Sequence, residues 1–155
     1  MTAVPIASIR GELARGDEAR RAAAVLLREG LQRDAMSRAY YAALHYARAL
    51  LLLKDEEPKT HEGVLRRFSL HFVRTAVLTT DEGKLLGRLH KLREEADYGM
   101  DRQYSSGDVR VELDGLEMFR SAVLRVLRIH GVESMGEPDG GGQECPDTPF
   151  PLNSL

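Results

Sequence analysis

The chain has 155 residues, a formal net charge of −2, 43% apolar residues and 30% charged residues. This length and composition are typical of one globular domain with a substantial core, and they exclude a largely disordered chain. The single cysteine, Cys145, excludes an internal disulfide and a thiolate metal cluster.

The apolar runs are short, as in Ala49 to Leu53, and the charged residues Arg10 and Glu12 precede any run that resembles a secretory signal. A membrane span needs about 20 consecutive apolar residues. We therefore expect no membrane association and a cytoplasmic protein.

Charge is distributed unevenly along the chain. All 22 Lys and Arg residues lie in residues 1–131, against 19 Asp and Glu there, whereas residues 132–155 contain five acids and no base. This last segment also holds four of the six prolines and a triple glycine, a composition that disfavours a packed element. We predict a helical domain over residues 1–131 and a flexible acidic tail over residues 132–155.

Five helical patterns precede the tail, and no alternating run is long enough for a strand, which predicts an all-α fold. The first pattern begins after Pro5, is interrupted at Gly16 and resumes over Asp17–Glu29. The second covers Gln32–Leu53.

Hydroxyl and acidic residues at the expected cap positions locate the other three helices. The third runs from a Thr60 cap to about Arg74, with a core side of Val64, Leu65, Phe68 and Phe72. The fourth runs from a Thr80 cap to near Asp97, with a core stripe of Leu85, Leu89, Leu92 and Ala96. The fifth starts at Asp108 and is closed by Gly131, with a stripe of Leu113, Leu116, Phe119, Val123 and Leu127.

The second helix is apolar almost all the way round but carries one polar stripe, formed by Arg38, Tyr41, His45 and Arg48. A buried guanidinium without a partner is too costly to keep. The stripe must therefore face a carboxylate, a solvent-filled cleft or an interface.

The fourth helix offers such a partner, because its second stripe consists of Leu86, His90, Arg93 and Asp97. If the two helices pack side by side, Asp97 pairs with Arg38. One polar pocket suited to a phosphate would then collect Arg38, His45, His90, Arg93, Asp97 and Tyr98. The alternative is that Arg38 and Asp97 form only a buried ion pair that sets the helix register.

Motifs for other chemistries are missing from the sequence. It contains no Glu-x-x-His, no glycine-rich phosphate loop and no His-Glu-x-x-His. We therefore expect no metal and no cofactor.

Three motifs occur in order: R-A-Y-Y-A at residues 38–42, K-T-H at residues 59–61 and R-x-x-A-D-Y at residues 93–98. In these motifs the chain resembles the HEPN superfamily, and within it a stand-alone prokaryotic group. The likeness covers roughly residues 10–130. It implies an up-and-down bundle of four to five helices, a homodimer, and a two-gene toxin and antitoxin module with a minimal nucleotidyltransferase.

The resemblance also implies a catalytic pattern, because active relatives are metal-independent ribonucleases that use Arg-x4-His. Arg93 matches the arginine, whereas Tyr98 occupies the histidine position. A phenol with an ordinary pKa of about 10 is a poor general base at neutral pH. His90 or His45 would have to substitute for the missing histidine.

Three functions remain open at this stage. The first is the HEPN component of such a module, binding RNA or nucleotide phosphate through a pocket between the second and fourth helices. The second is a metal-independent endoribonuclease toxin in which Arg93 stabilises the phosphate. The third is a non-catalytic dimerising scaffold.

Overall fold

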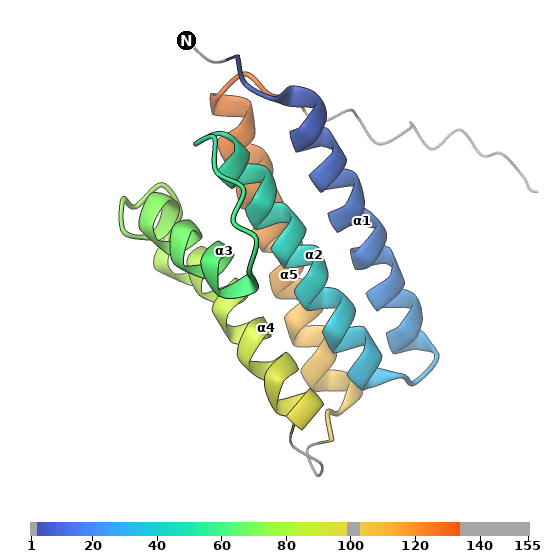
Figure 1. The fold of residues 1–155 in the computed structure, drawn as a ribbon. Coiled ribbons are helices and arrows are strands. Elements are labelled where there is room, and N and C mark those ends of the chain that lie inside the picture. The colour runs from blue at the N-terminus through green and yellow to red at the C-terminus, as the bar shows by residue number, and fades with distance from the viewer. Residues whose placement is uncertain (1–2, 99–102, 134–155) are drawn as a thin grey trace, which may run out of the picture.

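The computed structural model describes residues 3–98 and 103–133, and all regular structure in these ranges is helical, which confirms the all-α prediction. The elements are α1 (Ile6–Arg28), α2 (Gln32–Leu52), α3 (His61–Phe68), the π-helical turn η1 (Ser69–Val73), α4 (Thr80–Tyr98) and α5 (Ser106–Ile129). The five α-helices form a bundle with short connections (Figure 1). None of the helices described here combines the length and the apolar character that crossing a bilayer requires.

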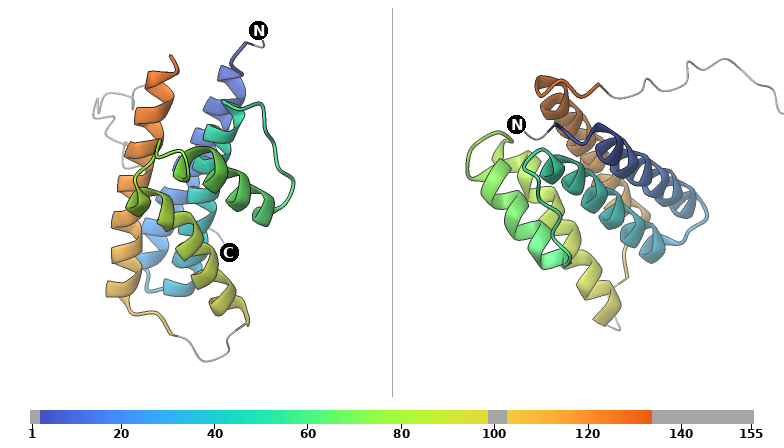
Figure 2. Two further views of the ribbon diagram at one scale, coloured as in Figure 1. Left: turned by 90° about the vertical axis from the view of Figure 1, so that its left-hand side faces the viewer. Right: turned by 45° about the horizontal axis from the view of Figure 1, so that its top comes forward.

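α2 lies at the centre of the bundle and packs against α1, α3, α4 and α5. Figure 2 shows α1 on one side of α2, and α3 with α4 on the other. A surface helix buries one stripe, but α2 buries 13 of its 21 residues. Its apolar residues therefore pack against several neighbouring helices, and its polar side chains lie at the boundaries between those helices.

α1 is continuous, so the predicted interruption at Gly16 is wrong. Gly16 is buried against α2, and a Cβ at this position would lie 2.5 Å from Cε1 of Tyr46. The glycine is there because the two helices approach closely, and its lack of a side chain makes room for the aromatic ring.

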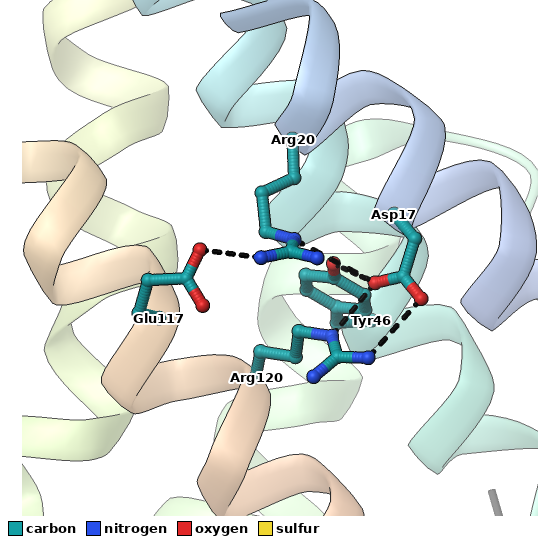
Figure 3. A network of polar contacts seen from close by, with 5 residues as sticks. All are labelled: Asp17, Arg20, Tyr46, Glu117 and Arg120. Atoms are coloured by element: carbon teal, nitrogen blue, oxygen red, sulfur yellow. Dashed lines mark hydrogen bonds and ion pairs between the residues drawn. The ribbon is translucent and has the colours of Figure 1, made fainter. Parts of the chain in front are cut away.

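Tyr46 is fully buried and belongs to a polar network that joins α1, α2 and α5 (Figure 3). Its hydroxyl donates to Oδ1 of Asp17 at 2.5 Å, and Arg120 donates to both oxygens of the same carboxylate at 2.7 and 3.2 Å. A second ion pair in the network joins Arg20 to Glu117 at 2.6 Å. The two acids balance the two guanidiniums, so this network ties helices together and leaves no surplus charge.

The π-helical turn divides the predicted third helix in two. Val64, Phe68 and Phe72 are buried as predicted, whereas Leu65 is only partly buried. Side chains four residues apart lie on the same face of a helix. Phe72 in η1 stays on the side of Phe68, with ring centroids 5.8 Å apart.

Thr60 caps α3 as predicted, but the next two caps lie earlier than expected. α4 is capped at Thr79 and not at Thr80: Glu82 N–H donates to Thr79 Oγ1 at 3.2 Å, and Thr79 N–H donates to Glu82 Oε2 at 2.9 Å. α5 is capped by Ser105 in the same reciprocal way with Asp108. In both cases the acid occupies the third helical position, where it completes a capping box.

Gly131 closes α5 as predicted. Its φ of +79°, a conformation that favours glycine, turns the chain so that Val132 N–H donates to the Leu127 carbonyl at 2.9 Å. Val132 is buried in the core. From residue 134 onward the predicted acidic tail lies outside the described residues.

We expect Gly16→Ala to lower the free energy of unfolding by about 1–3 kcal/mol, because the added methyl group forces Tyr46 or α1 to move. Urea unfolding followed by circular dichroism measures the change. Gly11→Ala is the matched control in the same helix, since a Cβ there meets nothing within 4 Å. Alanine favours the helix over glycine, so this control should gain up to about 1 kcal/mol. Equal stability of the two variants would contradict the close approach at Gly16.

Candidate functional site

Arg93 of α4 reaches across to α2 and α3. Its guanidinium carbon lies 4.8 Å from the ring centroid of Tyr41 and 5.2 Å from that of Tyr40. Its Nη1 lies 3.5 Å from Nδ1 of His61, and its Nε lies 3.5 Å from Oδ2 of Asp97, one turn further along α4. We call Tyr40, Tyr41, His61, His90 and Arg93 the Arg93 cluster. The cation lies over two aromatic rings, an arrangement that stabilises it without neutralising its charge.

Tyr40 is the buried side of the Arg93 cluster and contacts both Arg93 and His90. It is fully buried, and its hydroxyl lies 3.3 Å from Nδ1 of His90. Burial raises the pKa of Tyr40 to about 12, although the nearby Arg93 charge opposes this shift. The phenol is therefore neutral at physiological pH and serves as a packing and hydrogen-bonding group.

His61 is the first residue of α3, held in place by the Thr60 cap, whose Oγ1 accepts from Gly63 N–H at 3.0 Å. Its ring centroid lies 5.7 Å from that of Tyr40. Partial burial lowers the pKa of His61, and the positive charges of Arg93 and Arg48 lower it further. A histidine with a lowered pKa is neutral near pH 7 and can accept a proton.

Two guanidiniums at the cluster keep unused donors. The buried Nε atoms of Arg48 and Arg93 have no hydrogen-bond partner among the described residues. The third such atom is Nε of Arg20, but that side chain already binds Glu117 through Nη1. Buried polar groups are almost always paired. Nε of Arg93 makes only the 3.5 Å ion pair with Asp97, so neither donor is satisfied by a hydrogen bond from the described residues.

The acids near the cluster lie at its rim. Asp97 and Glu94 have side chains that are 47% and 56% exposed, whereas Arg93 is 23% exposed. Glu94 lies 3.3 Å from Nε2 of His90. The inner part of the cluster is thus cationic, which suits a phosphate or another anion.

Arg38 does not pair with Asp97, so this prediction is wrong. Arg38 is exposed, makes no ion pair within the described ranges, and lines a hollow between α1 and α2 together with Tyr41 and His45. Asp97 lies beside Arg93 instead. The reason is the position of α2 between its neighbours: Arg38 lines a hollow with residues of α1, whereas Asp97 lies on α4 beside Arg93.

His45 and Tyr98 also lie apart from the Arg93 cluster. Nδ1 of His45 lies 2.7 Å from Oε2 of Glu12 on α1. Burial would raise the pKa of Glu12, but the hydrogen bond with His45 and the charges of His45 and Arg48 outweigh it and hold that pKa below its usual value.

Tyr98 is 86% exposed at the end of α4. Of the six residues expected in one pocket, the structure brings together His90, Arg93 and Asp97.

Tyr40, Tyr41, His61 and Arg48 were missing from the predicted pocket. The signal that points to three of them is motif content: Tyr40 and Tyr41 belong to R-A-Y-Y-A, and His61 ends K-T-H. Helical periodicity alone gave no reason to place the start of α3 beside α4. The three motifs, far apart in the sequence, supply neighbouring side chains in the fold.

Metal chemistry finds no support in the described part of the chain, where no group of three or more His, Cys, Asp or Glu side chains could hold an ion.

Comparison with known proteins identifies the family. The HEPN domain model matches residues 11–127, so the chain belongs to the HEPN domain family. A protein of Methanocaldococcus jannaschii named "Putative toxin MJ0605" is 42% identical over 107 residues, which cover 69% of this chain and 79% of the relative. A UPF0332 protein of Thermotoga maritima is 30% identical over 105 residues, covering 68% and 80%. The UPF0332 protein PH1297 of Pyrococcus horikoshii is 48% identical over 62 residues, covering 40% and 44%.

We expect Arg93→Met to raise the pKa of His61 toward its ordinary value of about 6.5, because one nearby positive charge disappears while the burial of the ring persists. Proton NMR of the histidine ring signals against pH measures this pKa. Arg88→Met is the control on the same helix, since Arg88 pairs with Glu112 at 3.0 Å. The same pKa in the wild type and in Arg93→Met would show that Arg93 does not act on His61.

Proposed function

We propose that this chain is the HEPN component of a two-gene toxin and antitoxin module and that it binds RNA by a phosphate at the Arg93 cluster. The observation that carries the proposal is the Arg93 guanidinium, which lies over the rings of Tyr40 and Tyr41 and whose charge is met, within the described ranges, only by the 3.5 Å ion pair with half-exposed Asp97. The buried Nε of Arg48 also lacks a hydrogen-bond partner among the described residues. A phosphate oxygen is the acceptor that guanidiniums bind best after a carboxylate, and the cluster's carboxylates lie at its rim.

The role in a module has separate support. Two relatives from Methanocaldococcus jannaschii carry the word toxin in their names, and the resemblance in R-A-Y-Y-A and R-x-x-A-D-Y implies a homodimer and a minimal nucleotidyltransferase partner. Finding a gene for a small nucleotidyltransferase beside the gene for this chain would support the partner. Its absence from that neighbourhood would remove the argument for a two-gene module and leave the RNA site as a separate proposal.

We expect Arg93→Ala to weaken binding of a single-stranded RNA oligonucleotide at least about tenfold, since it removes a charge-assisted phosphate contact. Fluorescence anisotropy measures the dissociation constant, with 2′-O-methyl riboses in the probe so that it cannot be cleaved by attack of a 2′-hydroxyl. Arg88→Ala is the matched control, because Arg88 is 47% exposed and pairs with Glu112 outside the cluster. Equal binding by Arg93→Ala and the wild type would contradict the proposed site and favour the scaffold role.

A second candidate function is a metal-independent endoribonuclease, and the position of His61 favours it. His61 has a lowered pKa and lies 3.5 Å from Arg93. In this mechanism neutral His61 takes the proton of a ribose 2′-hydroxyl, whose oxygen attacks the adjacent phosphorus, while Arg93 stabilises the charge of the phosphorane. The bond from phosphorus to the 5′-oxygen then breaks, that oxygen takes a proton from water, and His61 returns its proton to the solvent. The products are a 2′,3′-cyclic phosphate and a 5′-hydroxyl. His61 would thus replace the histidine whose motif position Tyr98 occupies.

We expect His61→Ala to lose at least about 100-fold in cleavage of total RNA in EDTA, since general base catalysis contributes about that much or more. The wild type should stay active at more acidic pH than an ordinary histidine base allows, because the base must be unprotonated and its pKa is lowered. His130→Ala is the control, as His130 lies at the end of α5 and its ring Nδ1 lies 2.9 Å from the Val126 carbonyl oxygen. No cleavage by the wild type would exclude the nuclease and leave the binding role.

A further inference from the structure

A hollow of about 460 Å³ lies between α1 and α2, and Tyr41, whose ring Arg93 contacts, is one of the residues that line it. It is lined by Arg15, Glu18, Ala19, Ala22, Arg38, Tyr41 and His45. We call it the α1–α2 groove. The two alanines keep the space between the helices open, and the long side chains form its walls. Its volume falls within the range of small-ligand sites and is large enough for one or two nucleotides of a single strand.

The groove carries guanidinium groups that are available to a ligand. Arg38 is exposed and has no ion pair among the described residues. The side chain of Arg15 is 70% exposed, and its one ion pair is a long contact of 4.0 Å to Glu12. The other oxygen of Glu12 is already engaged by His45 at 2.7 Å. Among the described residues that line the groove, Glu18 is the only acid against the two guanidiniums of Arg15 and Arg38, and Glu12 is turned toward His45.

The α1–α2 groove and the Arg93 cluster are adjacent because both include Tyr41. Its ring lies 4.8 Å below the Arg93 guanidinium carbon, and the same residue lines the groove beside Arg38. One side chain thus separates two cationic sites. A flexible polyanion whose phosphates are joined by a short backbone can occupy both sites at once.

We propose that the α1–α2 groove is a second phosphate subsite, in which Arg15 and Arg38 bind the backbone of single-stranded RNA next to the nucleotide held at Arg93. This inference rests on the proposed function and adds the substrate class. Proteins that bind single strands line a groove with positive charge and add aromatic side chains. A duplex is too wide to enter a groove between two packed helices and would touch only its rim.

The test uses a 2′-O-methyl RNA octanucleotide of mixed sequence, labelled with fluorescein, and measures its dissociation constant by anisotropy at several salt concentrations. We expect the double variant Arg15→Ala and Arg38→Ala to bind about tenfold more weakly. The plot of log affinity against log salt should become less steep by about 1.4, because each lost phosphate contact contributes about 0.7 to its slope. The same octanucleotide annealed to its complement should bind more weakly than the single strand.

The matched control is the double variant Arg21→Ala and Arg33→Ala, which removes the same charge from the same two helices. Both arginines are exposed and lie outside the residues that line the groove. A thermal unfolding curve for each variant verifies that it is folded. A smaller salt slope in the groove variant but not in the control supports the inference.

Other outcomes overturn it in distinguishable ways. If the groove variant binds like the wild type while Arg93→Ala has lost binding, the second subsite is wrong and the proposed function stands. If Arg93→Ala binds like the wild type, or the wild type binds no RNA, the proposed function fails and the inference fails with it. Equal binding of duplex and single strand overturns the substrate class alone.

Discussion

The burial of α2 on several faces is the constraint on which the rest of the structure depends. A helix surrounded by four others can keep polar side chains only where two neighbours leave a seam. The close approach at Gly16 brings α1 onto α2 and confines Tyr46 to the interior. The polar residues of α2 therefore lie at two other helix–helix boundaries. Arg38 and His45 lie toward α1. Tyr40 and Arg48 lie toward α3 and α4.

The polar clusters of the bundle differ in charge balance, and this difference separates a structural role from a binding role. In the network around Asp17 two acids meet two guanidiniums, and most donors have acceptors (Figure 3). At the Arg93 cluster the cations lie inside and the acids at the rim. Aromatic rings hold the guanidinium in place without consuming its hydrogen-bond donors. An anion from outside can therefore bind at this cluster, whereas the charges of the Asp17 network are already balanced.

Errors in the sequence-based predictions arose where one residue type serves two purposes. A glycine within a helical pattern indicates either a break or a close contact, and at Gly16 it is a contact. An acid near a helix start is either the cap or its partner at the third position, and Asp108 and Glu82 are partners. The helical wheel placed Arg38 on a polar stripe, but it could not show that Arg38 and His45 lie toward α1 while Tyr41 of the same stripe meets Arg93 of α4.

The sequence by itself determined the helix content, most of the buried stripes and the family, because helical periodicity and short motifs are local properties of the chain. It also singled out Arg93 and His90. Only the tertiary structure decided which helices face each other, and so it alone placed His61 beside Arg93, Asp97 with Arg93, and Arg38 with Arg15. The physical reason is that a periodic pattern specifies the angle of a side chain around its own helix, whereas its partner depends on how all the helices pack.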